Sequence, residues 1–399
     1  ANYLFAGAAD LYAETGDPAL LATLDRMWND VVNHKMYITG GCGSLYDGVS
    51  NDGTSYDPND VEKLHQAYGR QYQLPNLTAH NETCANIGNV LWNWRMLLIT
   101  GEARYVDVVE LALYNSVLSG ISLDGKKFLY TNPLAYSDEL PFTQRWSKQR
   151  VPYISLSNCC PPNVVRTIAE VSNYLYSTSG KGIWLHLYGG NKLSTTLSDG
   201  SAVRLSEQTN YPWDGHITLR FDETAQKPFS VFLRIPGWCH HAKILVNGKL
   251  YSTETNGGTY AEVRRAWRKG DRLQLMLDMP ATMIEANPLV EETKNQVAVK
   301  RGPVVYCLES VDLDKKTSVF GITLSTNEVF KTVPLKIDNS NMMALETTGR
   351  KTDNGEWQDH LYKEVSKKPT ESIRIKLVPY FAWGNRGHSE MTVWLPVRK

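Results

Sequence analysis

Hydrophobic residues in the first part of the chain recur at the three- and four-residue spacing of an α-helix. The pattern predicts one helix up to about residue 15 and a second from about Pro18 to Val31, with Gly16 and Asp17 between them. A proline suits the first position of a helix and a glycine suits its end. These residues therefore mark the boundary between two helices.

This helical unit recurs further along the chain. Residues 15–17 (Thr-Gly-Asp) precede a Trp-Asn pair at 28–29, and residues 100–102 (Thr-Gly-Glu) precede a Tyr-Asn pair at 114–115 after about the same separation. Repeated helical hairpins imply a solenoid or a closed ring of helices. A third helix is expected from Asn163 to about residue 176, after a pair of prolines.

From about residue 183 the hydrophobic period changes to two, which is typical of β-strands. An Asn247-Gly248 pair gives a hairpin signal, and many short strands with such turns indicate a β-sandwich. A second β region begins near residue 296. Because helices and strands occupy separate blocks, we expect a helical domain at 1–178 followed by β-sandwich domains at 179–281 and 282–399.

Composition excludes several classes of protein. Of 399 residues, 42% are hydrophobic and 21% charged, which is typical of a globular chain and not of a disordered one. No apolar run reaches the roughly 18 residues that span a membrane. The 42 Lys and Arg balance the 42 Asp and Glu, which disfavours a nucleic-acid partner.

The chain starts with the pattern of a helix interior and has no leader sequence. We therefore expect a fragment or a processed chain that lacks an N-terminal part. The sequence leaves the oligomeric state and the compartment open, with the bacterial periplasm or cytoplasm as the expectation.

Two segments combine cysteines with a predicted helix start. One carries Glu82 and Cys84, and the other carries the adjacent pair Cys159 and Cys160. Three thiols and a carboxylate can supply the four ligands of a tetrahedral zinc ion, and adjacent cysteines rarely form a disulfide with each other. The alternative is that Cys84 is a small buried hydrophobic residue, Glu82 caps its helix and the cysteine pair is incidental.

Several motifs together resemble glycoside hydrolase families 127 and 146, the β-L-arabinofuranosidase-type enzymes. The resemblance covers essentially the whole chain. It is carried by GGCGS at 40–44, LPN at 74–76, ETCA at 82–85, GISLDGK at 120–126, CCPPN at 159–163, PWDG at 212–215, LRIPGW at 233–238 and RGPVVYC at 301–307.

The resemblance implies part of an (α/α)6 barrel followed by two β-sandwich domains, with roughly the first half of the barrel upstream of Ala1. It further implies a zinc ion held by Glu82, Cys84, Cys159 and Cys160. Cys159 would be the nucleophile, and the reaction would proceed with net retention. Coordination to zinc would deprotonate this thiol, and the thiolate would take the place of the second carboxylate of an ordinary retaining glycosidase.

The chain departs from the family at the acid/base position. Family 127 members place a glutamate sixteen residues before the zinc-ligand glutamate, where this chain has Gln66, and glutamine cannot transfer a proton. Glu62, one helical turn away, or a residue in the missing half could act instead, although Glu62 could equally be a solvated loop charge. His65, Gln66 and Tyr130 are the candidate substrate-binding residues, and Tyr130 matches an active-site tyrosine of the family.

The leading hypothesis is a zinc-dependent, retaining, exo-acting β-L-arabinofuranosidase for plant-derived glycans with arabinofuranosyl ends. We expect no nucleic-acid or membrane partner. One alternative is a non-catalytic glycan-binding protein stabilised by zinc, and another is a related glycosidase for a different pentose-type sugar. A third is a cysteine acyl-hydrolase that pairs Cys159 with His80 or His65, for which the chain shows no recognisable signature.

Overall fold

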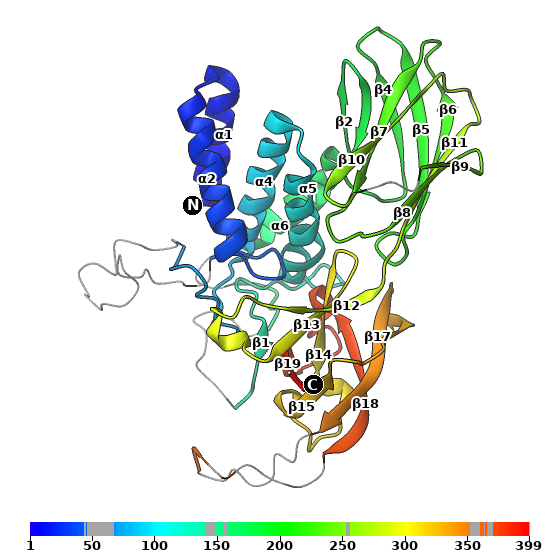
Figure 1. The fold of residues 1–399 in the computed structure, drawn as a ribbon. Helices are drawn as coiled ribbons and strands as arrows, with labels where there is room; N and C mark the ends of the chain where they lie inside the picture. The colour runs from blue at the N-terminus through cyan, green and yellow to red at the C-terminus, as the bar shows by residue number, and fades with distance from the viewer. Residues whose placement is uncertain are drawn as a thin grey trace. The chain divides into compact units, whose positions relative to one another are not determined.

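The computed structural model divides the chain into two compact units (Figure 1). Unit 1 combines Ala1–Asn89, Ala112–Val164 and Ala281–Lys399, and unit 2 combines Val90–Leu111 and Val165–Pro280. Each unit therefore joins helical segments to strands from distant parts of the sequence. The structure describes residues 1–43, 45, 68–139, 149–154, 158–252, 256–351, 360–362, 364 and 370–398.

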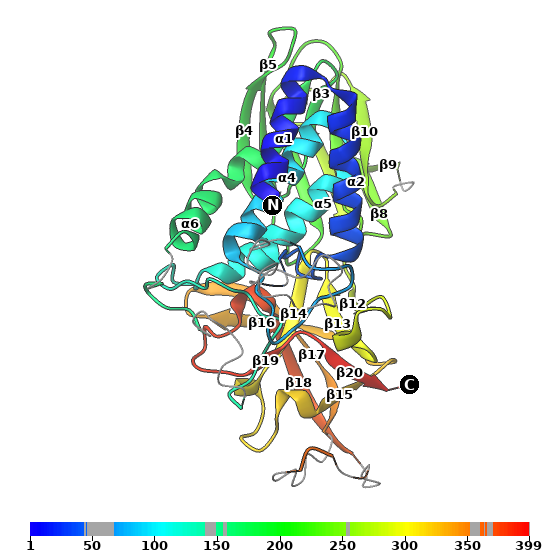
Figure 2. The same cartoon turned by 90° about the vertical axis from the view of Figure 1, so that its left-hand side faces the viewer.

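The first helical hairpin has the predicted boundary. Helix α1 (Asn2–Thr15) ends at Gly16, which takes the left-handed conformation with φ 67°. Helix α2 (Pro18–His34) begins after Asp17, whose carboxylate accepts a hydrogen bond from the Ala19 N–H at 2.9 Å. The two helices pack side by side in unit 1 (Figure 2).

The second hairpin repeats these boundary contacts. Helix α4 (Thr83–Thr100) is followed by Gly101, with φ 73°, and by helix α5 (Ala103–Ala112). The Thr100 hydroxyl donates to the Met96 carbonyl at 2.9 Å, as the Thr15 hydroxyl does to the carbonyl of Leu11 at 2.8 Å. The repeat predicted from the sequence is therefore confirmed for the caps of these two hairpins.

The residues that the structure describes between α5 and the third helix contain less helix than the predicted helical domain implies. A π-turn (Leu113–Val117) and a 3-10 turn (Leu118–Gly120) lead into loops and the short strand β1 (Ala135–Tyr136). Helix α6 (Cys160–Glu170) begins three residues before the predicted start, with both prolines in its first turn, where no N–H is needed. A short 3-10 turn (Val171–Tyr174) completes it.

The C-terminal strands of unit 1 form a ten-stranded sheet in the order β1-β19-β14-β18-β17-β15-β20-β13-β12, with β16 beside β17. A further pairing of β13 with β14 closes β14, β18, β17, β15, β20 and β13 into a six-stranded barrel. The strands are β12 (Ala281–Glu285), β13 (Gln296–Arg301), β14 (Val304–Glu309), β15 (Ile322–Ser325), β16 (Lys331–Ile337), β17 (Ser340–Lys351), β18 (Glu371–Pro379), β19 (Met391–Thr392) and β20 (Leu395–Arg398).

This barrel differs from the second β-sandwich that the sequence predicts. Alternating apolar residues face inward in both architectures, so the pattern does not distinguish them. Closure depends on pairings between distant strands, among them the parallel pairing of β15 with β20.

Long-range hydrogen bonds fasten the segments around Ser119 and Arg150 to the C-terminal part of unit 1. The buried guanidinium of Arg150 donates to the carbonyls of Ser119 and Phe381 at 3.1 and 3.0 Å, and also to the Trp383 carbonyl. The loops that support the candidate site are therefore held by the C-terminal part of the chain.

Asn115 makes a second such connection. Its side chain donates to the Pro303 carbonyl and accepts from the Val305 N–H, both at 2.8 Å, and it is fully buried. A single amide thus satisfies two backbone groups next to strand β14.

Unit 2 contains a four-stranded sheet, β10-β7-β3-β2, and a six-stranded sheet, β4-β5-β6-β11-β8-β9. Phe221 of β6 and Phe229 of β7 bring the two sheets into contact, with ring centroids 6.3 Å apart. The strands are β2 (Tyr176–Ser179), β3 (Gly182–Leu185), β4 (Asn191–Thr196), β5 (Ala202–Thr209), β6 (His216–Glu223), β7 (Phe229–Ile235), β8 (Ala242–Val246), β9 (Lys249–Ser252), β10 (Thr259–Arg265) and β11 (Arg272–Leu277).

The Asn-Gly hairpin is confirmed between β8 and β9. Asn247 and Gly248 have φ values of 51° and 77°, the positive pair that a type I′ turn needs. Among the helices that the structure describes, none is long and apolar enough to cross a membrane.

Candidate metal centre

The entry to helix α4 is held by two asparagines. Asn81 has a φ of 39°, a conformation that asparagine tolerates better than most residues. Its amide donates to the Asn132 carbonyl at 2.8 Å, and the Asn132 amide donates back to the carbonyl of Asn81 at 2.9 Å. A β-bridge between Glu82 and Thr131 follows directly. This clamp fixes the backbone from which Glu82 projects.

The backbone at Gly41 lies so close to the Asn81 side chain that the clamp depends on a glycine at this position. A Cβ at Gly41 would lie 2.2 Å from the side-chain oxygen of Asn81, which no real side chain could accept. Gly41 of the GGCGS motif therefore has a packing role beside the site.

The second cysteine segment reaches the first through paired loops. Phe128 and Val151 exchange two backbone hydrogen bonds, of 2.8 and 2.9 Å. Ile154 then packs with Cys84, Tyr130 and Cys160 in one buried cluster. Cys160 is the first residue of α6, and Cys159 directly precedes that helix.

The four candidate ligands converge. The sulfur of Cys160 lies 3.4 Å from that of Cys84 and 3.8 Å from that of Cys159. Oε1 of Glu82 lies 3.7 Å from the Cys159 sulfur and 4.0 Å from the Cys160 sulfur. One ligand atom from each residue lies within 4.8 Å of every other. We call these four residues the Glu/Cys3 group.

Exposure separates the three thiols of the group. Cys84 and Cys160 are buried, at 8% and 0% exposed, whereas Cys159 is exposed. Glu82 is also buried, at 7% exposed. Three donors thus form the floor of the group, and one faces outward.

The neighbouring thiols and burial set the protonation of Cys160 within the group. Hydrogen bonds to the Cys159 and Cys84 thiols, together with burial, raise the pKa of Cys160 well above its usual value. The Cys160 thiol is therefore neutral without a cation, and a bound cation would favour its thiolate. Cys₃-carboxylate is a donor set that suits a soft or borderline divalent metal.

His80 lies on the other side of the carboxylate. Its Nε2 is 3.6 Å from Oε2 of Glu82, and its ring centroid is 5.8 Å from that of Tyr130. The side chain is buried, at 6% exposed. His80 thus lies beside the carboxylate on the side away from the thiols, where outer partners of metal ligands are found.

The structure brings together four of the predicted site residues and adds Tyr130 to the cluster next to them. Glu62, His65 and Gln66 lie outside the described residues. A cavity of about 80 Å³ borders the group and is lined by Tyr3, Tyr68, His80, Glu82 and Cys84, among others.

Sequence reasoning missed the supporting residues. The clamp between Asn81 and Asn132 was not predicted, although an asparagine directly before the Glu-Thr-Cys motif is a signal for a positive φ. His80 enters the sequence-based hypotheses only as a base for Cys159, whereas its Nε2 lies 3.6 Å from Oε2 of Glu82.

Fold and site together define a multidomain protein with a helical part, two β parts and a thiol-rich group at two helix starts. Three family profiles match almost the whole length. They are the β-L-arabinofuranosidase GH127 catalytic domain at residues 3–173, the GH127 middle domain at 182–279 and the glycoside hydrolase family 127 C-terminal domain at 281–396. The chain belongs to glycoside hydrolase family 127.

Individual relatives agree with this assignment. A non-reducing end β-L-arabinofuranosidase of Bifidobacterium longum is 32% identical over 412 residues, which span 98% of this chain and 58% of the relative. A solved glycoside hydrolase is 50% identical to this chain, with a TM-score of 0.95. The match covers all of this chain and 66% of the solved chain. A solved GH127 β-L-arabinofuranosidase from Geobacillus stearothermophilus is 34% identical with a TM-score of 0.88.

The chain spans less than two thirds of the length of these relatives. It corresponds to 58% of the Bifidobacterium protein and 60% of the Geobacillus protein. The relatives therefore contain residues that have no counterpart in this chain.

Proposed function

We propose that the protein carrying this chain is a zinc-dependent, retaining, exo-acting β-L-arabinofuranosidase whose nucleophile is Cys159. Its substrates would be plant-derived glycans with arabinofuranosyl ends. The observation that carries the proposal is the convergence of Glu82, Cys84, Cys159 and Cys160, with ligand atoms within 4.8 Å of one another. The names of the relatives support the choice of sugar.

The Glu/Cys3 group fits zinc in both chemistry and size. Zinc–sulfur bonds of about 2.3 Å in a tetrahedron place neighbouring sulfurs roughly 3.8 Å apart. The sulfur–sulfur distances in the structure are 3.4 Å for Cys84–Cys160 and 3.8 Å for Cys159–Cys160. When bound, zinc would supply the positive charge that keeps the thiols deprotonated at neutral pH.

Cys159 is the thiol of this group that a substrate can reach, because Cys84 and Cys160 are buried. Its sulfur would attack the anomeric carbon of the terminal sugar. A carbon–sulfur bond forms, the glycosidic carbon–oxygen bond breaks, and an acid gives a proton to the leaving oxygen. Water then attacks the same carbon and gives a proton to the conjugate base, and the thiolate leaves. Two displacements at one carbon give net retention.

We propose two alternative candidates for the acid/base residue. Glu62 is one, and a residue upstream of Ala1 is the other, because Gln66 at the family's acid/base position cannot transfer a proton. His65, Gln66 and Tyr130 would contact the sugar. The burial of Tyr130, at 4% exposed, also supports a role in packing the cysteine floor.

We further propose that the helices are the C-terminal portion of an (α/α)6 barrel and that the sheets of unit 2 form a β-sandwich. The proposed domains are 1–178, 179–281 and 282–399. The repeated caps after Thr15 and Thr100 support the barrel. The contact of Phe221 with Phe229 between the two sheets supports the sandwich.

Zinc content is the first test, because all four proposed ligands lie in this chain. We expect about one zinc per chain in protein purified under reducing conditions, and loss of zinc in Cys84→Ala. Cys239→Ala is the matched control, because Cys239 is a buried free thiol in unit 2. A well-folded chain without zinc, or zinc retained in Cys84→Ala, would contradict the ligand set.

The nucleophile is tested in the full-length protein. Cys159→Ser should abolish hydrolysis of a β-L-arabinofuranoside while the circular dichroism spectrum stays unchanged. Undiminished hydrolysis in that variant would exclude the mechanism even if zinc is bound.

A second candidate function is glycan binding without catalysis, with zinc as a structural ion. Gln66 favours it, because the family's proton donor is missing at that position. Binding of arabinofuranosides without any turnover by the full-length protein would select it.

A further inference from the structure

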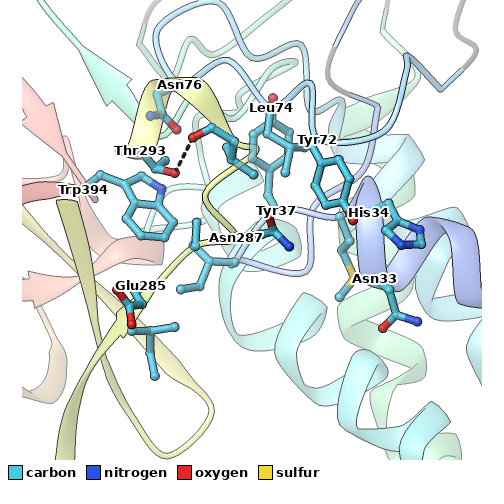
Figure 3. A pocket seen from close by; sticks show the side chains of 15 residues that line it. Asn33, His34, Tyr37, Tyr72, Leu74, Asn76, Glu285, Asn287, Thr293 and Trp394 are labelled. Atoms are coloured by element: carbon cyan, nitrogen blue, oxygen red, sulfur yellow. Dashed lines mark hydrogen bonds between the residues drawn. The ribbon is translucent and has the colours of Figure 1, made fainter. Parts of the chain in front are cut away.

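Unit 1 contains a second cavity, of about 230 Å³, which shares no lining residue with the Glu/Cys3 group. Figure 3 shows its walls: Asn33 and His34 at the end of α2, Tyr72 and Asn76 from the segment before α4, and Trp394 from the link between β19 and β20. Segments more than 300 residues apart in the sequence thus form one enclosure.

Tyr72 stands at the side of this cavity in a strained conformation. Its φ is +64°, in the left-handed region that non-glycine residues rarely adopt. The strain is held by a hydrogen bond of 2.8 Å from the Tyr72 N–H to the His34 carbonyl, and the two rings meet edge to face at 5.3 Å. Strained residues concentrate where a side chain must be presented to a ligand.

Asn76 contributes an unused acceptor at the opposite end. Its backbone N–H donates to Glu292 at 2.6 Å, and its backbone carbonyl accepts from Leu134 at 3.1 Å. The side chain is 92% buried, and among the described residues its Oδ1 has no hydrogen-bond partner. A buried acceptor of this kind is costly unless a ligand or water donates to it.

The lining indicates the chemistry of a ligand. Trp394 and Tyr72 supply aromatic surface, while Asn76, Asn287 and Glu285 supply hydrogen-bonding groups. None of the described lining residues is Lys or Arg, which disfavours a phosphate or carboxylate ligand. An aromatic wall with a few convergent polar groups suits a molecule with apolar C–H faces and hydroxyl edges.

We propose that this cavity binds one neutral sugar residue of a glycan, at a site separate from the Glu/Cys3 group. Its volume, just below the usual 300–1,000 Å³ of pockets for larger ligands, fits a single ring and not an extended oligosaccharide. The aromatic faces would cover the C–H surface of the ring, and the Asn76 side chain would accept a hydrogen bond from a hydroxyl.

The test is a calorimetric titration of the 399-residue chain with L-arabinose and with D-galactose. Asn287→Ala and Tyr72→Gly should each weaken binding about fivefold or more, because each removes a contact to the ring or to a hydroxyl. Asn327→Ala, an exposed asparagine in unit 1 outside the cavity, is the matched control and should leave binding unchanged.

Stability separates a binding role from a structural one. Glycine adopts a positive φ without strain, so Tyr72→Gly should fold and melt close to the parent while binding is weakened. If neither sugar binds at millimolar concentration, or if both cavity variants bind like the parent, the proposal is overturned.

The same titration distinguishes this proposal from the proposed function. Cys159→Ser should bind the sugar as the parent does, whatever happens to hydrolysis. Binding that is lost in Cys84→Ala but kept in Asn287→Ala would place the sugar at the Glu/Cys3 group and overturn the proposal. Hydrolysis without sugar binding at this cavity would overturn it and leave the proposed function standing.

Discussion

Replacing Arg234 with methionine should destabilise unit 2 strongly. The side chain of Arg234, on strand β7, is 0% exposed. Its Nη1 lies 2.6 Å from Asp107 and its Nη2 lies 2.5 Å from Glu110, both on helix α5. Its Nε donates to the His186 carbonyl at 2.5 Å. One guanidinium thus joins a helix to a sheet.

The magnitude follows from the burial of each partner. Removing one member of a buried ion pair destabilises a protein by about 3–5 kcal/mol, because a charge stays buried without compensation. Glu110 is 1% exposed, but it keeps hydrogen bonds from Tyr211 at 2.6 Å and Trp238 at 3.2 Å. The Asp107 side chain is 25% exposed and partly screened by water. We therefore expect a loss near the lower end, about 3 kcal/mol.

Urea unfolding monitored by tryptophan fluorescence and circular dichroism measures this loss. Arg220→Met is the matched control. Arg220 also lies in unit 2 and contacts Asp222 at 3.1 Å, but it is 58% exposed, so its loss should be below about 1 kcal/mol.

The loss should also depend on pH. Burial raises the pKa of Asp107, and Arg234 acts against that rise. Without the arginine the folded-state pKa of Asp107 rises further. A carboxyl group whose folded-state pKa is raised contributes stability below its unfolded-state pKa of about 3.9. This contribution is lost as the pH rises through the folded-state pKa. The difference in unfolding free energy between parent and variant should therefore widen from about pH 4 to pH 7.

Two results would refute this reasoning. One is a loss in Arg234→Met no larger than that in Arg220→Met, which would mean that the buried charges are compensated in another way. The other is a gap that narrows as the pH rises, which would reverse the sign assigned to Asp107.

Three further predictions concern other parts of the chain. Chelation of a zinc-loaded chain should lower its melting temperature, since a ligand at 100–1,000 times its Kd stabilises by about 3–4 kcal/mol, and calorimetry with and without chelator measures the shift. Burial lowers the pKa of His186 to about 3, so the stability of unit 2 should fall as the pH drops from about 6.5 towards 3, and His186→Gln should flatten that part of an acid-unfolding curve. Asn115→Leu leaves two buried backbone groups unpaired and should cost about 2–4 kcal/mol in denaturant unfolding, whereas the exposed control Asn327→Ala should cost less than about 0.5 kcal/mol.

Local features were predicted well from the sequence alone. The break between α1 and α2 is set by Gly16, Asp17 and Pro18, whose dihedral preferences and side-chain cap act within three residues. The Asn247-Gly248 turn is equally local. Such features depend on short stretches of chain, so a pattern read over a few residues contains the information.

Features that depend on pairing between distant segments were not predicted from the sequence. The sequence did not distinguish a closed barrel from a sandwich, because the two differ in which strands pair. Strand β1 pairs with β19 through Ala135 and Thr392, which no local pattern could indicate. Hydrophobic alternation shows which side of a strand is buried but not which strand lies next to it.

The candidate metal site shows the same division between what the sequence determines and what the tertiary structure determines. The sequence determined which residue types could bind a metal and, through resemblance, which four would do so. Only the tertiary structure decided that their atoms meet, that Cys159 is exposed and that His80 lies beside Glu82. The physical reason is that Glu82 and Cys159 are 77 residues apart, and their approach depends on hydrogen bonds such as those between Asn81 and Asn132, which form only when the loops have folded.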